Sequence, residues 1–366
     1  MNDSGENVRP VSVLVVDDSA FMRTALSRMI DSDPALRVAG TAQNGMQALE
    51  KIVELQPDVV TLDVEMPRLN GIETLKRIMQ EFPRPVIMVS SLTQAGAEST
   101  LEALDIGAFD YVSKQESFAS LDIVNIRHDL VAKIRAAAEM NRRCTVVRVA
   151  KPPMPARIAA SHAPLVQPAV VALGTSTGGP KALQQMLPTL PRDLSVGVLV
   201  VQHMPMGFTG PFANRLNQLC QVAVKEATHD QTIEPGVVYI APAGQHLTVM
   251  RRSPAKVVTR LSASPEGTLH RPSVDVMMLS VAEVFGALAM GVIMTGMGAD
   301  GVEGMKAIGK AGGLTVGQDE NSCTVYGMPR SCAEAGVLQR VVPLDQIPGE
   351  ILQATRYQER THKVSV

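Results

Sequence analysis

The first 140 residues alternate between short apolar segments and segments with helical periodicity, and this alternation allows few folds. A helical segment follows each apolar one, and the last helical segment runs roughly from Leu121 to Met140. The pattern predicts parallel strands with helices on both faces of the sheet. The sequence therefore predicts a five-stranded, doubly wound α/β domain. Its strands are expected at 11–16, 36–42, 58–63, 85–90 and 109–112.

A proline-rich stretch separates this domain from a second one. Residues 151–168 contain five prolines and no apolar periodicity, which is typical of an extended linker. We expect a receiver-sized domain at 1–140, a linker at 141–168, a larger, mostly parallel α/β domain at 169–356 and a polar tail at 357–366. In the larger domain, strands are expected at 169–174, 196–201, 237–241, 246–250, 256–261, 291–295 and 314–317, and helices near 180–187, 208–219, 274–285, 300–310 and 345–355.

Composition excludes several functional classes. Hydrophobic residues make up 45% and charged residues 19%, which is globular composition. A formal net charge of −2 argues against nucleic acid and anionic membranes as partners. The polar first ten residues lack the core of a signal peptide, and the longest apolar runs are too short for membrane insertion. The four cysteines form no CxxC pair, as expected of reduced thiols, so we expect a cytoplasmic location.

Three carboxylates follow strands of the first domain. Asp17 and Asp18 come just after the first strand and Asp63 ends the third, and these two strands flank the point where the strand order reverses. Three carboxylates gathered there would repel one another without a hard cation, for which Mg²⁺ is the natural candidate. Asp63 would then act as a nucleophile toward a phosphoryl group. The alternative is that Asp18 and Ser19 only cap the helix that begins near Ala20.

Two further strand ends favour the phosphoryl interpretation. Ser90 closes the fourth strand and Lys114 follows the fifth, where a hydroxyl and an ammonium can bind phosphoryl oxygens. With these residues in place, the segment 11–125 resembles a response-regulator receiver domain. The matching stretches are VVDDS (15–19), LDVEMPRLNG (62–71), MVSS (88–91) and GAFDYVSK (107–114).

The receiver resemblance implies a flavodoxin-like fold and a role for each matching residue. It implies that Asp63 is the phospho-acceptor and that Mg²⁺ is held by Asp18 directly, by Asp17 largely through water, by Asp63 and by the backbone carbonyl of Glu65. It further implies that Ser90 and Lys114 are switch residues and that Tyr111 is the aromatic residue that changes rotamer. Receivers usually carry proline after this lysine, whereas this sequence has Gln115.

The second domain opens with a nucleophile-elbow pattern. The stretch 174–178 reads G-T-S-T-G between an expected strand and an expected helix, which presents Ser176 at a sharp turn. The N–H of Thr177, at the helix amino terminus, is a candidate oxyanion donor. One alternative is a dinucleotide-binding turn, but its middle glycine is absent, and Asp193, the acidic residue nearest to the required distance, precedes the next strand instead of ending it. The other alternative is a bare phosphate-binding turn.

A histidine and an aspartate follow two other strands of this domain. His203 comes directly after 196–202 and Asp300 follows the strand expected at 291–295. Parallel strands present their carboxyl ends at one edge, so Ser176, His203 and Asp300 can supply a nucleophile, a general base and an orienting carboxylate. The chain order Ser-His-Asp differs from that of the common α/β-hydrolase superfamily.

Residues 169–355 resemble the catalytic domain of chemotaxis protein-glutamate methylesterases. The resemblance implies a triad of Ser176, His203 and Asp300, with Met297 in a loop near the oxyanion. The matching stretches are GTSTGGP (174–180), VVQHMPMGFTGPFANRLN (200–217), YIAPAGQHL (239–247), HRPSVDVMMLSVA (270–282), MTGMGADG (294–301) and CTVYGMPR (323–330). His246 and His270 either line the same cleft or have ordinary structural roles.

What the family resemblance implies for function is a phosphorylation-activated hydrolase without a cofactor in its catalytic domain. Its expected substrates are glutamyl methyl esters, and glutamines, of chemoreceptor cytoplasmic domains, and a chemotaxis histidine kinase is the expected phosphodonor. Two alternatives remain open at this point. One is a receiver-controlled hydrolase of another ester, and the other is a receiver joined to a non-catalytic effector.

Overall fold

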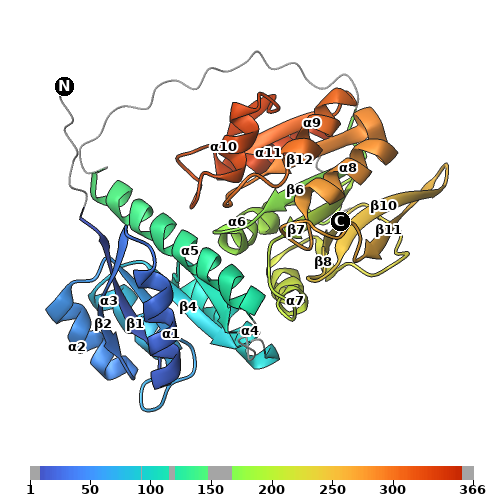
Figure 1. Cartoon of the computed structure of the whole chain (residues 1–366). Helices are drawn as coiled ribbons and strands as arrows, with labels where there is room; N and C mark the ends of the chain where they lie inside the picture. Colours follow the sequence, from blue (N-terminus) through green and yellow to red (C-terminus); the bar gives the residue numbers. More distant parts are fainter. Residues whose placement is uncertain (1–8, 92, 115–119, 147–166, 357–366) are drawn as a thin grey trace, which may run out of the picture. The chain divides into compact units, whose positions relative to one another are not determined.

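The computed structural model describes residues 9–91, 93–114, 120–146 and 167–356, and the chain divides into two compact units at Pro152–Pro153 (Figure 1). Each unit is considered by itself. Most of the expected linker, the expected tail and Gln115 lie outside the described residues.

The first unit is the predicted five-stranded, doubly wound domain. All neighbouring strands are parallel and their order is β2-β1-β3-β4-β5, so β1 and β3 lie side by side at the reversal point. The elements are β1 (Val11–Val16), α1 (Ala20–Asp31), β2 (Leu36–Ala42), α2 (Gly45–Leu55), β3 (Val59–Asp63), α3 (Gly71–Glu81), β4 (Val86–Ser91), α4 (Gln94–Ile106), β5 (Asp110–Lys114) and α5 (Ser120–Val146).

Local chemistry accounts for these elements. The apolar residues of β1 and β3 are buried, as expected for central strands covered by helices on both faces. Four of the helices begin at a polar side chain that accepts a hydrogen bond from the first turn, namely Ser19, Asn44, Asn70 and Thr93. Helix α1 packs with α5, whereas α2, α3 and α4 pack in succession. Helix α5 continues past its expected end near Met140 to Val146.

The second unit is built on a seven-stranded sheet in which every neighbouring pair is parallel, in the order β14-β13-β12-β6-β7-β9-β8. Its elements are β6 (Val170–Thr175), α6 (Gly179–Met186), η1 (Leu187–Thr189), β7 (Gly197–Gln202), α7 (Thr209–Leu219), β8 (Ala223–Glu226), β9 (Val237–Ile240), β10 (His246–Ser253), β11 (Lys256–Ser262), α8 (Val274–Phe285), η2 (Gly286–Leu288), β12 (Ala289–Ile293), α9 (Val302–Lys310), β13 (Leu314–Gln318), α10 (Met328–Glu334), β14 (Arg340–Val342), η3 (Leu344–Gln346) and α11 (Ile347–Ala354).

The observed elements agree with the expected α/β class and differ in detail. Strands β10 and β11 are present as expected, but they form a separate antiparallel hairpin, drawn in yellow in Figure 1, that packs on α8. The expected strand at 291–295 lies at 289–293. Three short elements, β8, β14 and α10, were not expected from the sequence.

The strand order brings three strand ends together. Strand β6 lies between β12 and β7. The strands that follow β6 in the chain, β7 to β9, lie on one side of it, and the later strands β12 to β14 lie on the other, so the strand order reverses at β6. Ligand sites of open α/β sheets form at such a reversal, beyond the carboxyl ends of the strands. Among the helices that the structure describes, none combines the length and apolar character that a membrane span needs.

Candidate phosphorylation and active sites

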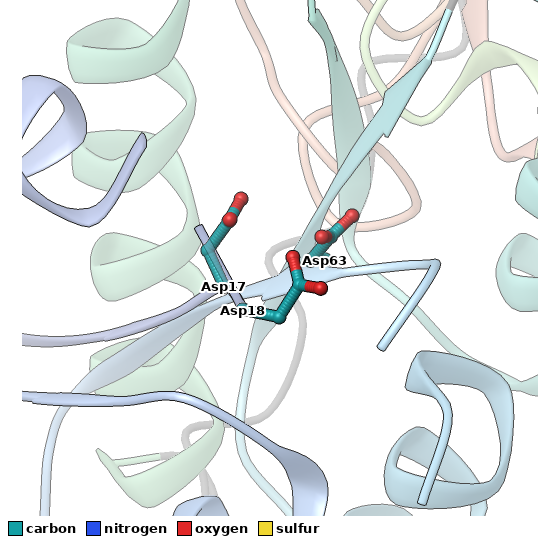
Figure 2. Close-up of side chains that lie close together, drawn as sticks. All are labelled: Asp17, Asp18 and Asp63. Atoms are coloured by element: carbon teal, nitrogen blue, oxygen red, sulfur yellow. The ribbon is translucent and has the colours of Figure 1, made fainter. Parts of the chain in front are cut away.

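The carboxylates of Asp17, Asp18 and Asp63 gather at the carboxyl edge of the first sheet (Figure 2). One oxygen of each lies within 4.8 Å of the others, and Asp17 and Asp63 are buried while Asp18 is exposed. Helix α1 is capped by Ser19, whose hydroxyl accepts from the N–H of Met22, so the cap does not use Asp18. A set of three close carboxylate oxygens with one side open to solvent suits a hard divalent cation such as Mg²⁺.

Lys114 ties two of these carboxylates together. Its Nζ lies 2.7 Å from Oδ2 of Asp63 and 2.9 Å from Oδ2 of Asp17. Burial raises the pKa of Asp63 to about 6, with repulsion by Asp17 acting in the same direction and Lys114 opposing both. Burial lowers the pKa of Lys114, but the bonds to the two carboxylates outweigh it and leave that pKa raised.

The other expected receiver residues lie on neighbouring strands. Asp63 on β3 pairs with Val89 on β4, and Ser90 is the next residue of β4. The Ser90 side chain is buried, and its hydroxyl donates to the carbonyl of Gly96 at 3.1 Å. Tyr111 is buried in β5, which raises the pKa of its phenol. Glu65 comes two residues after Asp63, and its N–H donates to that carboxylate at 3.3 Å.

The sequence did not reveal Lys133, which joins α5 to β5. Its ammonium donates to the carbonyl of Tyr111 at 2.6 Å and to the carboxylate of Asp129 at 2.9 Å. It also lies 5.3 Å from the centroid of the Tyr111 ring. A lysine in the middle of a long helix carries no local sign of such a role, because the contact depends on how α5 packs.

Ser176 lies in the expected strand–turn–helix setting. Strand β6 ends at Thr175 and α6 begins at Gly179. Gly178 has a φ of 75°, which favours glycine, and a Cβ there would lie 2.4 Å from Thr324. Within the described part of the chain, the Ser176 hydroxyl and the N–H groups of Thr177 and Met297 make no hydrogen bond. No described residue therefore uses these two N–H groups, and they can donate to a ligand.

His203 and Asp300 are in direct contact. Nε2 of His203 lies 2.8 Å from Oδ2 of Asp300, and their side chains are 7% and 13% exposed. A carboxylate only accepts, so Nε2 carries a hydrogen, and in the neutral imidazole Nδ1 then has a lone pair. Nδ1 is buried and has no hydrogen-bond partner among the residues described. His203 and Ser176 follow paired strand positions, because Thr175 pairs with Gln202.

The amino terminus of α8 holds Asp300 in place. Ser273 Oγ and the N–H of Asp275 donate to Oδ1 at 2.8 and 2.9 Å, and the N–H of Val274 donates to Oδ2 at 2.7 Å. Burial alone would raise the pKa of Asp300, but the hydrogen bond and charge of His203 and these N–H groups hold it well below its usual range. Asp300 is thus a carboxylate at neutral pH, as an orienting group must be.

Two supporting residues were missed in the sequence. The side-chain amide of Gln202 donates to the carbonyls of both Ser176 and His203 at 3.0 Å, so one side chain joins the two loops. Ser273 caps α8 and binds Asp300. A glutamine at the end of an otherwise apolar strand is a sequence feature that could have indicated the role of Gln202. Ser273 lies in a stretch that was noted only for its resemblance to the family.

The two histidines that the sequence left open have different surroundings. His246 is fully buried, and its ring contacts the carbonyl of Pro265, the hydroxyl of Thr268 and the N–H of Ser273, each at 3.2 Å. That is a structural role. His270 instead stacks on His203.

Known proteins share both units. The family described as CheB methylesterase matches residues 171–351, and the response regulator receiver domain matches residues 13–124. Protein-glutamate methylesterase/protein-glutamine glutaminase of Pyrococcus horikoshii is 44% identical over 94% of this chain and 94% of its own length. Its namesake from Geobacillus kaustophilus is 46% identical over 94% of this chain and 99% of its own.

A solved structure extends the likeness to the fold. The crystal structure of the Thermotoga maritima CheB methylesterase catalytic domain aligns with a TM-score of 0.50 and 38% identity, over 51% of this chain and 99% of that one. Fold and matches define a class of protein in which a receiver domain is followed by a methylesterase domain. The chain belongs to the family of protein-glutamate methylesterases/protein-glutamine glutaminases. The sequence-based expectation of a carboxylic ester hydrolase of this family is thereby confirmed.

Proposed function

We propose that this enzyme hydrolyses glutamyl methyl esters, and deamidates glutamines, on cytoplasmic domains of chemoreceptors, with Ser176, His203 and Asp300 as its triad. The observation that carries this proposal is the contact of 2.8 Å between His203 and a largely buried, hydrogen-bonded Asp300, at the edge where Ser176 directly follows the adjacent strand β6. The enzyme acts in the cytoplasm, where these receptor domains and a chemotaxis histidine kinase are accessible.

The geometry supports a two-step acyl transfer. Ser176 Oγ attacks the glutamyl carbonyl while Nδ1 of His203 takes its proton, and the N–H groups of Thr177 and Met297 receive the oxyanion. The imidazolium, stabilised by Asp300, then protonates the departing methoxide, or the amide nitrogen in deamidation. Water attacks the glutamyl-serine ester by the reverse proton route and releases glutamate and free Ser176.

The receiver residues support control by phosphorylation. Asp17, Asp18, Asp63 and the carbonyl of Glu65 would hold Mg²⁺, which neutralises charge during phosphoryl transfer. Asp63 accepts the phosphoryl group from the kinase. Lys114, already 2.7 Å from Asp63, then pairs with a phosphoryl oxygen, Ser90 donates to another, and Tyr111 repacks in β5.

One assay tests the proposal. Radiomethylated receptor membranes are incubated with the enzyme and Mg²⁺, with and without a small-molecule phosphodonor, and methanol release is followed. Ser176→Ala should lose activity by a factor on the order of 10⁶, as removal of a triad nucleophile does. Asp63→Asn should keep the basal rate and lose the response to the phosphodonor. A Ser176→Ala variant with even a tenth of the wild-type rate would exclude the covalent mechanism, and wild-type cleavage of simple esters only would favour a different substrate.

A further inference from the structure

His270 lies flat against the ring of the general base. The centroids of the His203 and His270 rings are 4.0 Å apart and the ring planes differ by 21°. With that ring on one face and Asp300 at Nε2, the His203 side chain is only 7% exposed. Stacked aromatic rings attract one another. His270 comes from the segment between β11 and α8, so it reaches His203 from outside the three strands that carry the triad.

The backbone around His270 is anchored on its carboxyl side. The carbonyl of Arg271 accepts from the N–H of Gly244 at 3.0 Å. The N–H of Ser273 donates to Nδ1 of the buried His246 at 3.2 Å, and the Ser273 hydroxyl binds Asp300 at 2.8 Å. The segment that presents the His270 ring is therefore tied to the same carboxylate that holds His203. A ring fixed in this way can restrain its neighbour.

The bond to Asp300 alone leaves one motion open to the imidazole. A single contact at Nε2 permits the ring to tilt out of plane, which would change the direction in which the buried Nδ1 points. The stacked ring of His270 opposes this tilt, because the tilted ring would collide with it or lose its stacking contact. We propose that His270 is a positioning residue that keeps the His203 ring oriented with Nε2 on Asp300 and Nδ1 available to Ser176. The proposal rests on the triad assigned under the proposed function.

Substitution of His270 separates stacking from other roles. In the phosphorylated full-length enzyme, His270→Ala should lower kcat for methanol release by about 10-fold, the scale that loss of one aromatic contact predicts. KM should stay within about twofold, because substrate binding is not the step affected. His270→Phe restores a flat ring without a titrating group and should recover kcat to within about threefold of wild type. His229→Ala, which changes an exposed histidine on the β11 side, is the control and should leave both constants unchanged.

A spectroscopic measurement tests the orientation directly. In protein labelled with ¹⁵N-histidine, the ring signals of His203, assigned with His203→Gln, should show a protonated Nε2 and an unprotonated Nδ1. His270→Ala should bring the two shifts toward each other as the fixed tautomer is lost, and His270→Phe should not. Unchanged kcat and shifts in His270→Ala would overturn the proposal, as would a Phe variant no better than Ala. If the wild type released no methanol, the proposed function would fail, and the ring shifts alone would still decide this inference.

Discussion

A Cβ atom at position 179 would lie 2.0 Å from Oε1 of Gln202, so Gly179 leaves the space that the Gln202 side chain fills. From that position, Gln202 donates to the carbonyls of Ser176 and His203. The glycine after the nucleophile turn thus has a purpose that the sequence did not reveal. It makes room for a side chain that joins the loop of the nucleophile to the loop of the general base.

Gly179→Ala should destabilise the second unit by roughly 1–3 kcal/mol, the usual cost of overpacking a closed site. The new methyl group would also lie 2.4 Å from the hydroxyl of Thr175. Gly349→Ala is the matched control, because that helical glycine is exposed and a Cβ there meets no atom within 4 Å. The control should be stabilised by about 0.5–1 kcal/mol. Denaturant unfolding measures the free energy of unfolding of both variants and of the wild type. Equal values for the two variants would show that the structure around Gly179 relaxes to admit the methyl group.

Gln202→Glu should lower kcat by about 10²-fold, the scale of a misplaced reacting group. The substitution keeps the shape of the side chain but turns its donor into an acceptor that faces two carbonyl oxygens. The Ser176 and His203 loops would then move apart. Gln353→Glu, on an exposed position of α11, introduces the same charge away from the site and should have no effect. Methanol release measures both, and full activity in Gln202→Glu would mean that the bridge is dispensable.

Much of both sites followed from strand order. Asp17 and Asp63 lie close together, and Ser176 and His203 follow paired positions of neighbouring strands, because parallel strands in a doubly wound sheet end at one edge. Short apolar runs predict those strands directly. Lys114 was expected after a strand and in fact ends β5, a boundary difference that does not move it away from Asp63.

The supporting contacts did not follow from local sequence. Ser273 reaches Asp300 only because the amino terminus of α8 packs against the loop after β12, a tertiary relationship that no spacing encodes. The stacking of His270 on His203 is of the same kind. The three residues of β14 are too few to show a strand period, and alternation in β10 and β11 predicts strands without saying which sheet they join.

Asp300→Asn should reduce stability as well as activity. The carboxylate accepts from three donors of the α8 amino terminus. In asparagine, the NH₂ group that replaces one carboxylate oxygen would point its own hydrogens at one or more of these donors. At pH 7 the variant should be less stable by about 1–3 kcal/mol. We expect a smaller loss of kcat than in Ser176→Ala, because the imidazole remains in place. A loss equal to that of Ser176→Ala would instead show that Asp300 holds the loop together.

The pH dependence of this effect has a defined sign. The pKa of Asp300 is lowered in the folded protein, so its carboxylate stabilises the fold above the unfolded pKa of about 3.9 and ceases to do so as the pH falls through the folded value. The stability difference between wild type and Asp300→Asn should therefore be largest near neutral pH and shrink below about pH 4. Denaturant unfolding at several pH values measures it, and a difference that grew on acidification would contradict the assignment of Asp300 as the ionised partner of His203.

Removal of the receiver should raise the basal activity of the catalytic unit. We expect the unphosphorylated receiver to restrict access to Ser176, and phosphorylation of Asp63 to weaken that restriction by drawing Lys114 from the Asp17–Asp63 pair to the phosphoryl group. A fragment of residues 167–366 keeps the bonds from Gln167 to Thr355 and from Ala169 to Leu288 that close the second unit. Methanol release by this fragment should exceed that of the unphosphorylated whole chain at equal concentration. The Ser176→Ala fragment is the control for contaminating esterase. A fragment slower than the unphosphorylated chain would rule out inhibition by the receiver and would mean that the receiver assists catalysis even without phosphorylation.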